Sequence, residues 1–187
     1  DLEKTNYIEW RKSAQSAYIK LAKDYDKIYV IGTSLGGLLA LDIAANHKVQ
    51  GLVVVNTPIE LNSALTDLIP LIYLVSPYSI RALFTLEELS VAVELKLYDT
   101  LPLKSAAQLM SYLNFVKTQL KKINSPILVV QATKDDLVKP ESAIYILNNV
   151  NSKNKDLLWL RNSTHINIVK DDRELLKQRG YKFIKND

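Results

Sequence analysis

Two spacings of hydrophobic residues follow one another in the first part of the chain. In residues 7–25 apolar side chains recur every three or four positions among Lys, Asp and Glu, which predicts an amphipathic helix. Residues 27–31 then form a short run of β-branched and aromatic side chains that ends at Gly32, as expected of a buried strand. The pattern therefore changes from the helix period to the strand period directly before Gly32.

The same alternation continues towards the C-terminus. Residues 35–47 are apolar on nearly all sides, which predicts a helix buried against a sheet, and residues 49–55 form a second buried strand. A strand, a helix and a strand in this order imply a parallel crossover. Two more strands and a closing amphipathic helix are predicted at 126–131, 156–160 and 171–184. This order predicts an α/β fold with a mainly parallel sheet flanked by helices.

The region between the second and third predicted strands interrupts the alternation with helical segments. Thr85 and Glu88 have the spacing of a capping box, and we interpret residues 58 to about 104 as a small helical cap inserted between two strands. A last helix in this region, with apolar positions from Ala106 to Leu120, is predicted to return to the sheet. Residues 1–187 therefore form one domain with an insertion.

Composition excludes several kinds of function. The 187 residues are 48% hydrophobic, which is enough for one substantial core, and the absence of Cys excludes a cysteine nucleophile and thiolate metal ligands. The net charge of +4 comes from 24 basic and 20 acidic residues that are scattered along the chain, so we expect no nucleic-acid partner. No run approaches the roughly 18 apolar residues that span a bilayer, so we expect no stable membrane insertion.

The segment Gly32-Thr33-Ser34-Leu35-Gly36 is the first candidate for chemistry. It follows a predicted buried strand without a gap and opens a predicted buried helix, which is the setting that presents a serine on a sharp, strained turn. We expect that side chains at Gly32 and Gly36 would keep the strand and the helix apart. The helix N-terminus favours an oxyanion beside the serine, so the backbone N–H of Leu35 is the predicted first oxyanion donor.

A serine needs a base to take its proton, and the chain has two histidines. His47 follows Ser34 by 13 residues along the predicted helix, about 20 Å away at 1.5 Å per residue, which is too far. His165 lies in the loop after the fourth predicted strand, and parallel strands end at the same edge of a sheet. His165 is therefore the predicted base.

The acid that orients the base should lie in the loop after the third predicted strand. Asp135 and Asp136 are both available there, and either one gives the chain order Ser, Asp, His that one known class of serine hydrolases uses. The carboxylate would hold the imidazole in the correct tautomer. The other Asp of the pair is then a solvated turn residue.

With these residues the sequence resembles the α/β-hydrolase family, and within it the small bacterial carboxylesterases and monoacylglycerol-lipase-like enzymes. Residues 131–143 look like the acid loop of that family, in which the first acidic position is the catalytic one, so the resemblance favours Asp135. The family commonly has Ser-Gly-His in its last loop, and this chain departs from that pattern with Thr164 between Ser163 and His165.

The resemblance also implies a longer chain. In this family the strand before the nucleophilic serine is the fifth, and a second oxyanion N–H comes from the loop after the third strand. Only 33 residues precede Ser34, so we expect the natural chain to extend further at its N-terminus; otherwise residues 27–31 would form an exposed apolar edge strand. The chain starts at Asp1 without a leader, and we expect a cytoplasmic protein, with a signal peptide further upstream as the open alternative.

These residues together predict ester hydrolysis through an acyl-enzyme with Ser34, His165 and Asp135. No metal and no organic cofactor are expected, and the predicted substrates are small-molecule esters of short to medium acyl chains or monoglycerides, bound beside the apolar residues 68–75. A thioesterase or acyltransferase would use the same three residues. A binding protein of the same fold without catalysis is the alternative from a different class.

Overall fold

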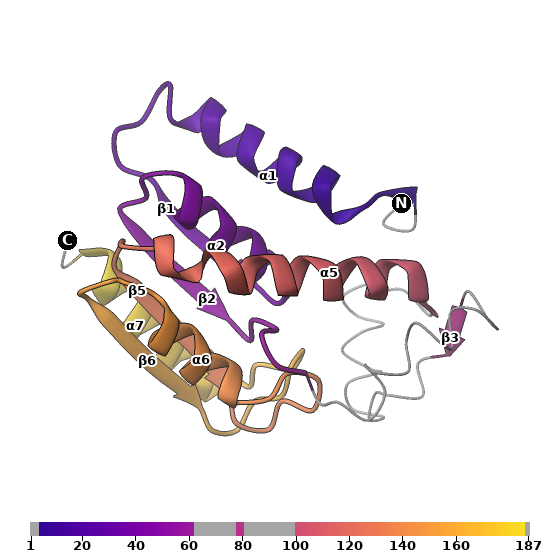
Figure 1. Ribbon diagram of the computed structural model, residues 1–187. Coiled ribbons are helices and arrows are strands. Elements are labelled where there is room, and N and C mark those ends of the chain that lie inside the picture. Colours follow the sequence, from indigo (N-terminus) through magenta and orange to yellow (C-terminus); the bar gives the residue numbers. More distant parts are fainter. Residues whose placement is uncertain (1–3, 62–77, 81–99, 186–187) are drawn as a thin grey trace.

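A parallel sheet with helices on both faces forms the centre of the molecule (Figure 1). The computed structural model describes residues 4–61, 78–80 and 100–185. Within them the sheet has the order β1 (Tyr29–Thr33), β2 (Gly51–Val55), β5 (Ile127–Ala132), β6 (Lys155–Leu160), and each neighbouring pair is parallel. The four predicted strands are confirmed, with ends that differ by one or two residues. β1 lies at one edge of this sheet, and its residue Ile31 is 63% exposed.

Five α-helices are described around the sheet, and their bounds are α1 (Tyr7–Leu21), α2 (Leu35–Asn46), α5 (Leu103–Gln119), α6 (Glu141–Asn149) and α7 (Lys170–Lys185). A 3₁₀ turn, η2 (Leu120–Lys122), extends α5. Four of these helices were predicted, although α1 ends at Leu21 rather than near residue 25. Helix α6 was not predicted, because its first three residues were interpreted as part of the acid loop 131–143 and the rest of the helix is short.

The central strands β2 and β5 bury side chains on both faces, which is why they are largely apolar. Leu52 and Val54 of β2 pack with α2, α5 and α6 on one face. Val53 and Val55 point to the other face, where α7 covers them with Leu176 and Phe183. The α/β architecture predicted from the alternation is therefore confirmed, and α2 is the helix that the sheet and its neighbours bury most completely.

A buried carboxylate fixes α2 against α1 and α5. Asp42 of α2 is 1% exposed and accepts two hydrogen bonds from Arg11, at 2.5 Å from Nε and 3.1 Å from Nη2. The Tyr112 hydroxyl of α5 donates to the same carboxylate at 3.1 Å. Burial, together with the charge of Asp42, raises the pKa of Tyr112, so its hydroxyl keeps the proton that it donates. This network positions the helix that begins beside Ser34.

The predicted cap is only partly described. Within it, β3 (Tyr78–Ile80) and β4 (Thr100–Pro102) form a two-stranded antiparallel sheet that the sequence pattern did not predict. The capping-box segment at Thr85 and the apolar residues 68–75 lie outside the described residues. Among the described residues, no helix has the length and apolar character needed to cross a membrane.

Candidate active site

Ser34 lies on the sharp turn between β1 and α2. Its backbone has φ 52° and ψ −123°, a conformation that costs a residue with a side chain about 1 to 3 kcal/mol. The Ser34 N–H donates to the carbonyl of Val55 at 2.9 Å, which ties the turn to the end of β2. The Ser34 hydroxyl makes no capping hydrogen bond to α2, although the serine occupies the N-cap position. The turn therefore holds the backbone and leaves the hydroxyl directed elsewhere.

The glycines of the turn have different roles. A Cβ on Gly32 would lie 2.1 Å from the backbone oxygen of Gly36, so the turn excludes a side chain at Gly32. A Cβ on Gly37 would lie 2.0 Å from Oγ1 of Thr57, which packs against the start of α2. A Cβ on Gly36 would meet none of the described residues within 4 Å. The expectation that Gly36 is needed for close approach is wrong, because a side chain there meets none of the described residues, whereas Gly37 makes the close contact with Thr57.

This difference predicts a matched pair of variants. Gly32→Ala should destabilise the protein by about 2 to 3 kcal/mol, because the new methyl group meets rigid backbone, and should lower Tm by about 5 to 10 °C. Gly36→Ala should leave Tm unchanged or raise it slightly, since alanine favours a helix over glycine. Thermal melting followed by circular dichroism measures both. A Gly32→Ala protein that melts with the wild type would contradict the close approach.

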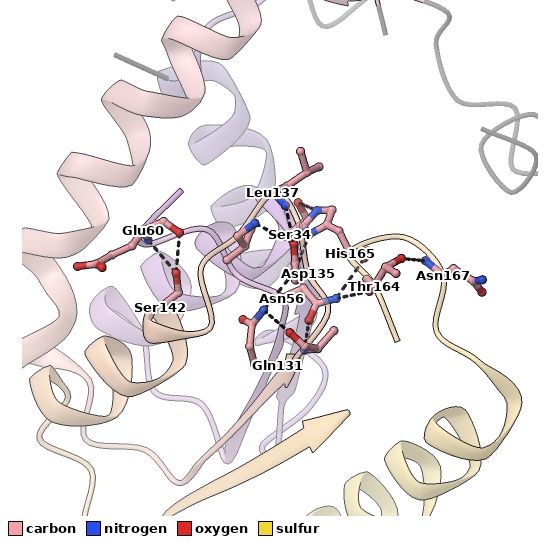
Figure 2. A network of polar contacts seen from close by, with 12 residues as sticks. Ser34, Asn56, Glu60, Gln131, Asp135, Leu137, Ser142, Thr164, His165 and Asn167 are labelled. Carbon is pink, nitrogen blue, oxygen red and sulfur yellow. Dashed lines mark hydrogen bonds and ion pairs between the residues drawn. The ribbon is translucent and has the colours of Figure 1, made fainter. Parts of the chain in front are cut away.

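The structure brings the side chains of Ser34, His165 and Asp135 together (Figure 2). Ser34 Oγ lies 3.0 Å from His165 Nε2, and His165 Nδ1 lies 2.8 Å from Asp135 Oδ2. The three residues come from the ends of β1, β5 and β6, which meet at one edge of the parallel sheet. The side chains therefore form one continuous chain of hydrogen bonds.

The Asp135 carboxylate is held by its own loop. Its side chain is fully buried, and its Oδ1 accepts hydrogen bonds from the backbone N–H groups of Leu137 at 3.0 Å and Val138 at 2.8 Å. The Gln131 side chain donates to Oδ2 at 3.2 Å. These bonds fix the position of the carboxylate that faces the imidazole. Asp136 is exposed on the same loop.

The loop that carries His165 is anchored to the start of α7. Asp172, which is 5% exposed, accepts hydrogen bonds from the Asn162 N–H at 2.8 Å and the Ser163 hydroxyl at 2.7 Å. Thr164 Oγ1 accepts from the Asn167 N–H at 3.3 Å. Thr164, which departs from the glycine common in similar enzymes, thus supports the loop through its hydroxyl.

The remaining predicted residues lie where the sequence suggested. Leu35 is the first residue of α2, and amide groups at that position have no acceptor within their own helix. His47 lies at the opposite end of α2, where its ring stacks on Tyr18 at 4.6 Å between centroids. Among the described residues no group of three or more His, Asp or Glu side chains is arranged to hold a metal.

Two polar residues of the site were missed by sequence reasoning. Gln131 was counted as the last residue of a buried strand, and Asn56 as the residue after one. Both are buried, at 1% and 0% exposure, and both donate to the loops that carry Asp135 and His165. The signal that could have found them is the presence of a large amide directly at the end of an apolar strand, where burial demands hydrogen-bond partners.

The acid loop is also joined to the chain that follows β2. Ser142 Oγ accepts from the Glu60 N–H at 2.8 Å and lies 2.9 Å from the Glu60 carbonyl, to which it donates. Figure 2 shows this pair beside the site. A short bridge between Leu61 and Val138 continues the contact. The loop of Asp135 is therefore held on both of its sides.

The strand, sharp turn and buried helix, with a serine, a histidine and an aspartate at one sheet edge, define an α/β hydrolase. The family model described as "Serine aminopeptidase, S33" matches residues 13–172, and the chain belongs to this family. The match includes Ser34, Asp135 and His165.

Two relatives are similar along almost the whole chain. A carboxylesterase of Bacillus subtilis (strain 168) is 26% identical over 185 residues, which cover 98% of this chain and 74% of the relative. A thermostable monoacylglycerol lipase of Bacillus sp. (strain H-257) is 28% identical over 189 residues, with coverage of 98% and 72%. The predicted resemblance to small bacterial esterases and monoacylglycerol lipases is confirmed.

Solved structures confirm the fold. The structure from a study of two metagenome-derived lipolytic enzymes superimposes with a TM-score of 0.82 at 21% identity, covering all of this chain and 76% of the other. The monoacylglycerol lipase of Paleococcus ferrophilus gives a TM-score of 0.78 at 17% identity, covering 98% and 77%. The chain is thus an α/β hydrolase in fold and an esterase-type hydrolase in family.

Proposed function

We propose that the protein hydrolyses carboxylic esters through an acyl-enzyme formed on Ser34. The observation that carries the proposal is the continuous chain of hydrogen bonds from Ser34 Oγ through the His165 ring to Asp135, at 3.0 Å and 2.8 Å. These distances lie within the range for a nucleophile, a base and the group that orients the base. The proposed substrates are small-molecule esters of short to medium acyl chains, or monoglycerides.

In the first half-reaction His165 acts as the base for Ser34. Asp135 accepts a hydrogen bond from the Nδ1–H of His165, which leaves Nε2 unprotonated and able to accept the proton of Ser34. Ser34 Oγ then attacks the ester carbonyl carbon, and its proton passes to Nε2. The former carbonyl oxygen now carries a negative charge and accepts a hydrogen bond from the Leu35 N–H at the start of α2. Collapse of this intermediate transfers the Nε2 proton to the departing alcohol.

The second half-reaction repeats these roles with water. His165 Nε2 takes a proton from a water molecule as the water oxygen attacks the acyl-enzyme carbonyl. The tetrahedral intermediate collapses, the carboxylic acid leaves, and the proton on Nε2 returns to Ser34 Oγ. The imidazole alternates between base and acid in each half, so its position relative to Ser34 governs both.

The similarity to a carboxylesterase and a monoacylglycerol lipase supports an ester substrate. The family description names an aminopeptidase, which cleaves an amide bond with a poorer leaving group. A test should therefore compare an ester, a thioester and an amide of the same acyl group. The comparison separates an esterase from a thioesterase and from an amide hydrolase that uses the same side chains.

The expected result is a preference for esters that depends on acyl length. In a p-nitrophenyl ester series from acetate to palmitate, kcat/KM should peak between acetate and octanoate and fall towards palmitate. The p-nitroanilide and the coenzyme A thioester of the best acyl group should react more slowly than the ester. Absence of turnover with every substrate would favour a binding protein, and a faster thioester or anilide would replace the proposed ester.

A further inference from the structure

Asn56 occupies the point where the three loops of the site meet. It follows β2 directly, is fully buried, and has a left-handed backbone with φ 45°. Asparagine is one of the few residues with a side chain that adopts this conformation at low cost. Its N–H donates to the Val130 carbonyl at 2.9 Å, and the carbonyl of the preceding Val55 accepts from Ser34. The backbone at this position therefore connects the serine turn to the end of β5.

The Asn56 side chain connects the other two loops. Its Oδ1 accepts a hydrogen bond from the Ala132 N–H at 2.8 Å, three residues before Asp135. Its Nδ2 donates to the backbone carbonyl of His165 at 3.1 Å and to that of Thr164 at 3.4 Å (Figure 2). One carboxamide thus holds the strand end that leads to the acid and the backbone of the base itself.

The chemistry of these partners requires a carboxamide. Two carbonyl oxygens need a donor and one backbone N–H needs an acceptor, and a buried group without its partner costs about 1 to 3 kcal/mol. Of the side chains of this size, only asparagine presents two donor hydrogens and an acceptor oxygen at once. An aspartate would keep the acceptor and lose the donors, whereas an apolar side chain would lose both.

The other hydrogen bonds that hold the histidine loop involve residues on either side of His165. Asp172 holds Asn162 and Ser163, and Thr164 holds Asn167, through atoms other than the His165 backbone. Within the described residues, the contact to the His165 carbonyl comes from Asn56. A shift of that backbone would carry the imidazole away from Ser34 and Asp135.

We propose that Asn56 is a positioning residue that sets the place of the His165 ring between Ser34 and Asp135. The inference rests on the proposed function, because it needs His165 as the base. It predicts a loss in the chemical step rather than in substrate binding, since Asn56 is buried behind the loops.

Two substitutions and one control test the inference. Asn56→Asp keeps the left-handed backbone and removes the donors, and Asn56→Gly keeps the backbone and removes the whole amide. Val116→Ala, at a fully buried position of α5, serves as the control for general destabilisation. A misplacement of about 1 Å costs about 100-fold in rate, so both Asn56 variants should lower kcat about 100-fold while KM changes little.

A spectroscopic readout separates positioning from stability. The proton between His165 Nδ1 and Asp135 should give a far-downfield proton NMR signal in the wild type and in Val116→Ala. It should move upfield or broaden in both Asn56 variants. Unchanged kcat and an unchanged signal in these variants would overturn the inference alone. Wild-type protein that is not modified at Ser34 by an aryl phosphonate would overturn the proposed function and the inference together.

Discussion

Ser34→Ala is expected to lower kcat for the best p-nitrophenyl ester by about 10⁶-fold, the loss typical when a serine nucleophile is removed. The hydroxyl makes its hydrogen bond to His165 and none to α2, so its removal should leave the fold intact. Circular dichroism and thermal melting should therefore give wild-type values. Steady-state kinetics at saturating ester measures the loss.

Ser16→Ala is the matched control for this variant. Ser16 is an exposed serine of α1, and its replacement should leave kcat within about twofold of the wild type, as is usual for surface substitutions. Comparable turnover by Ser34→Ala and Ser16→Ala would show that another group attacks the ester.

Asp135→Asn is expected to lower kcat by about 10⁴-fold. An asparagine amide facing Nδ1 favours the wrong tautomer, in which Nε2 carries the proton and cannot accept one from Ser34. The carboxylate also stabilises the imidazolium that forms when Ser34 attacks. The measurement is kcat across the neutral pH range, with folding checked by thermal melting.

Asp136→Asn removes the neighbouring carboxylate and serves as the comparison. Asp136 is exposed, whereas the Asp135 side chain is fully buried against His165, so Asp136→Asn should keep kcat within a few-fold of the wild type. If Asp136→Asn were the damaging substitution, the assignment of the acid would be reversed.

The sheet could be predicted from the sequence because its two central strands, β2 and β5, are buried on both faces. Runs such as residues 51–55 and 127–130 are apolar without interruption. A short apolar run of this kind is typical of a strand that is buried on both faces. The position of Ser34 followed from the apolar run at residues 27–31, since Ser34 comes directly after β1. The order of the strands then placed His165 at the same sheet edge as Ser34.

The features that sequence reasoning missed depend on contacts between distant residues. Gly36 and Gly37 look equivalent in the sequence, and only the approach of Thr57 distinguishes them. The role of Asn56 depends on carbonyl groups more than 100 residues away. Local propensity carries no information on such pairs, although burial of an amide is a hint that partners exist.

The short elements were missed for a different reason. Helix α6 has nine residues, and β3 and β4 have three each, so their patterns are too short to separate from a loop. Helix α6 is stabilised by burial of Ala143 and Ile146 against the core rather than by its length. Tertiary packing decides the structure at such positions.

Covalent labelling tests the central claim most directly, because an aryl phosphonate reacts only with an activated nucleophile and remains attached. The protein should gain the mass of one phosphonyl group, and peptide mapping should locate it on Ser34, with no labelling in Ser34→Ala. His165→Ala should slow the labelling strongly, since the proton of Ser34 then has no acceptor. A label on any other residue, or unchanged labelling of Ser34→Ala, would contradict the assignment of Ser34 as the nucleophile.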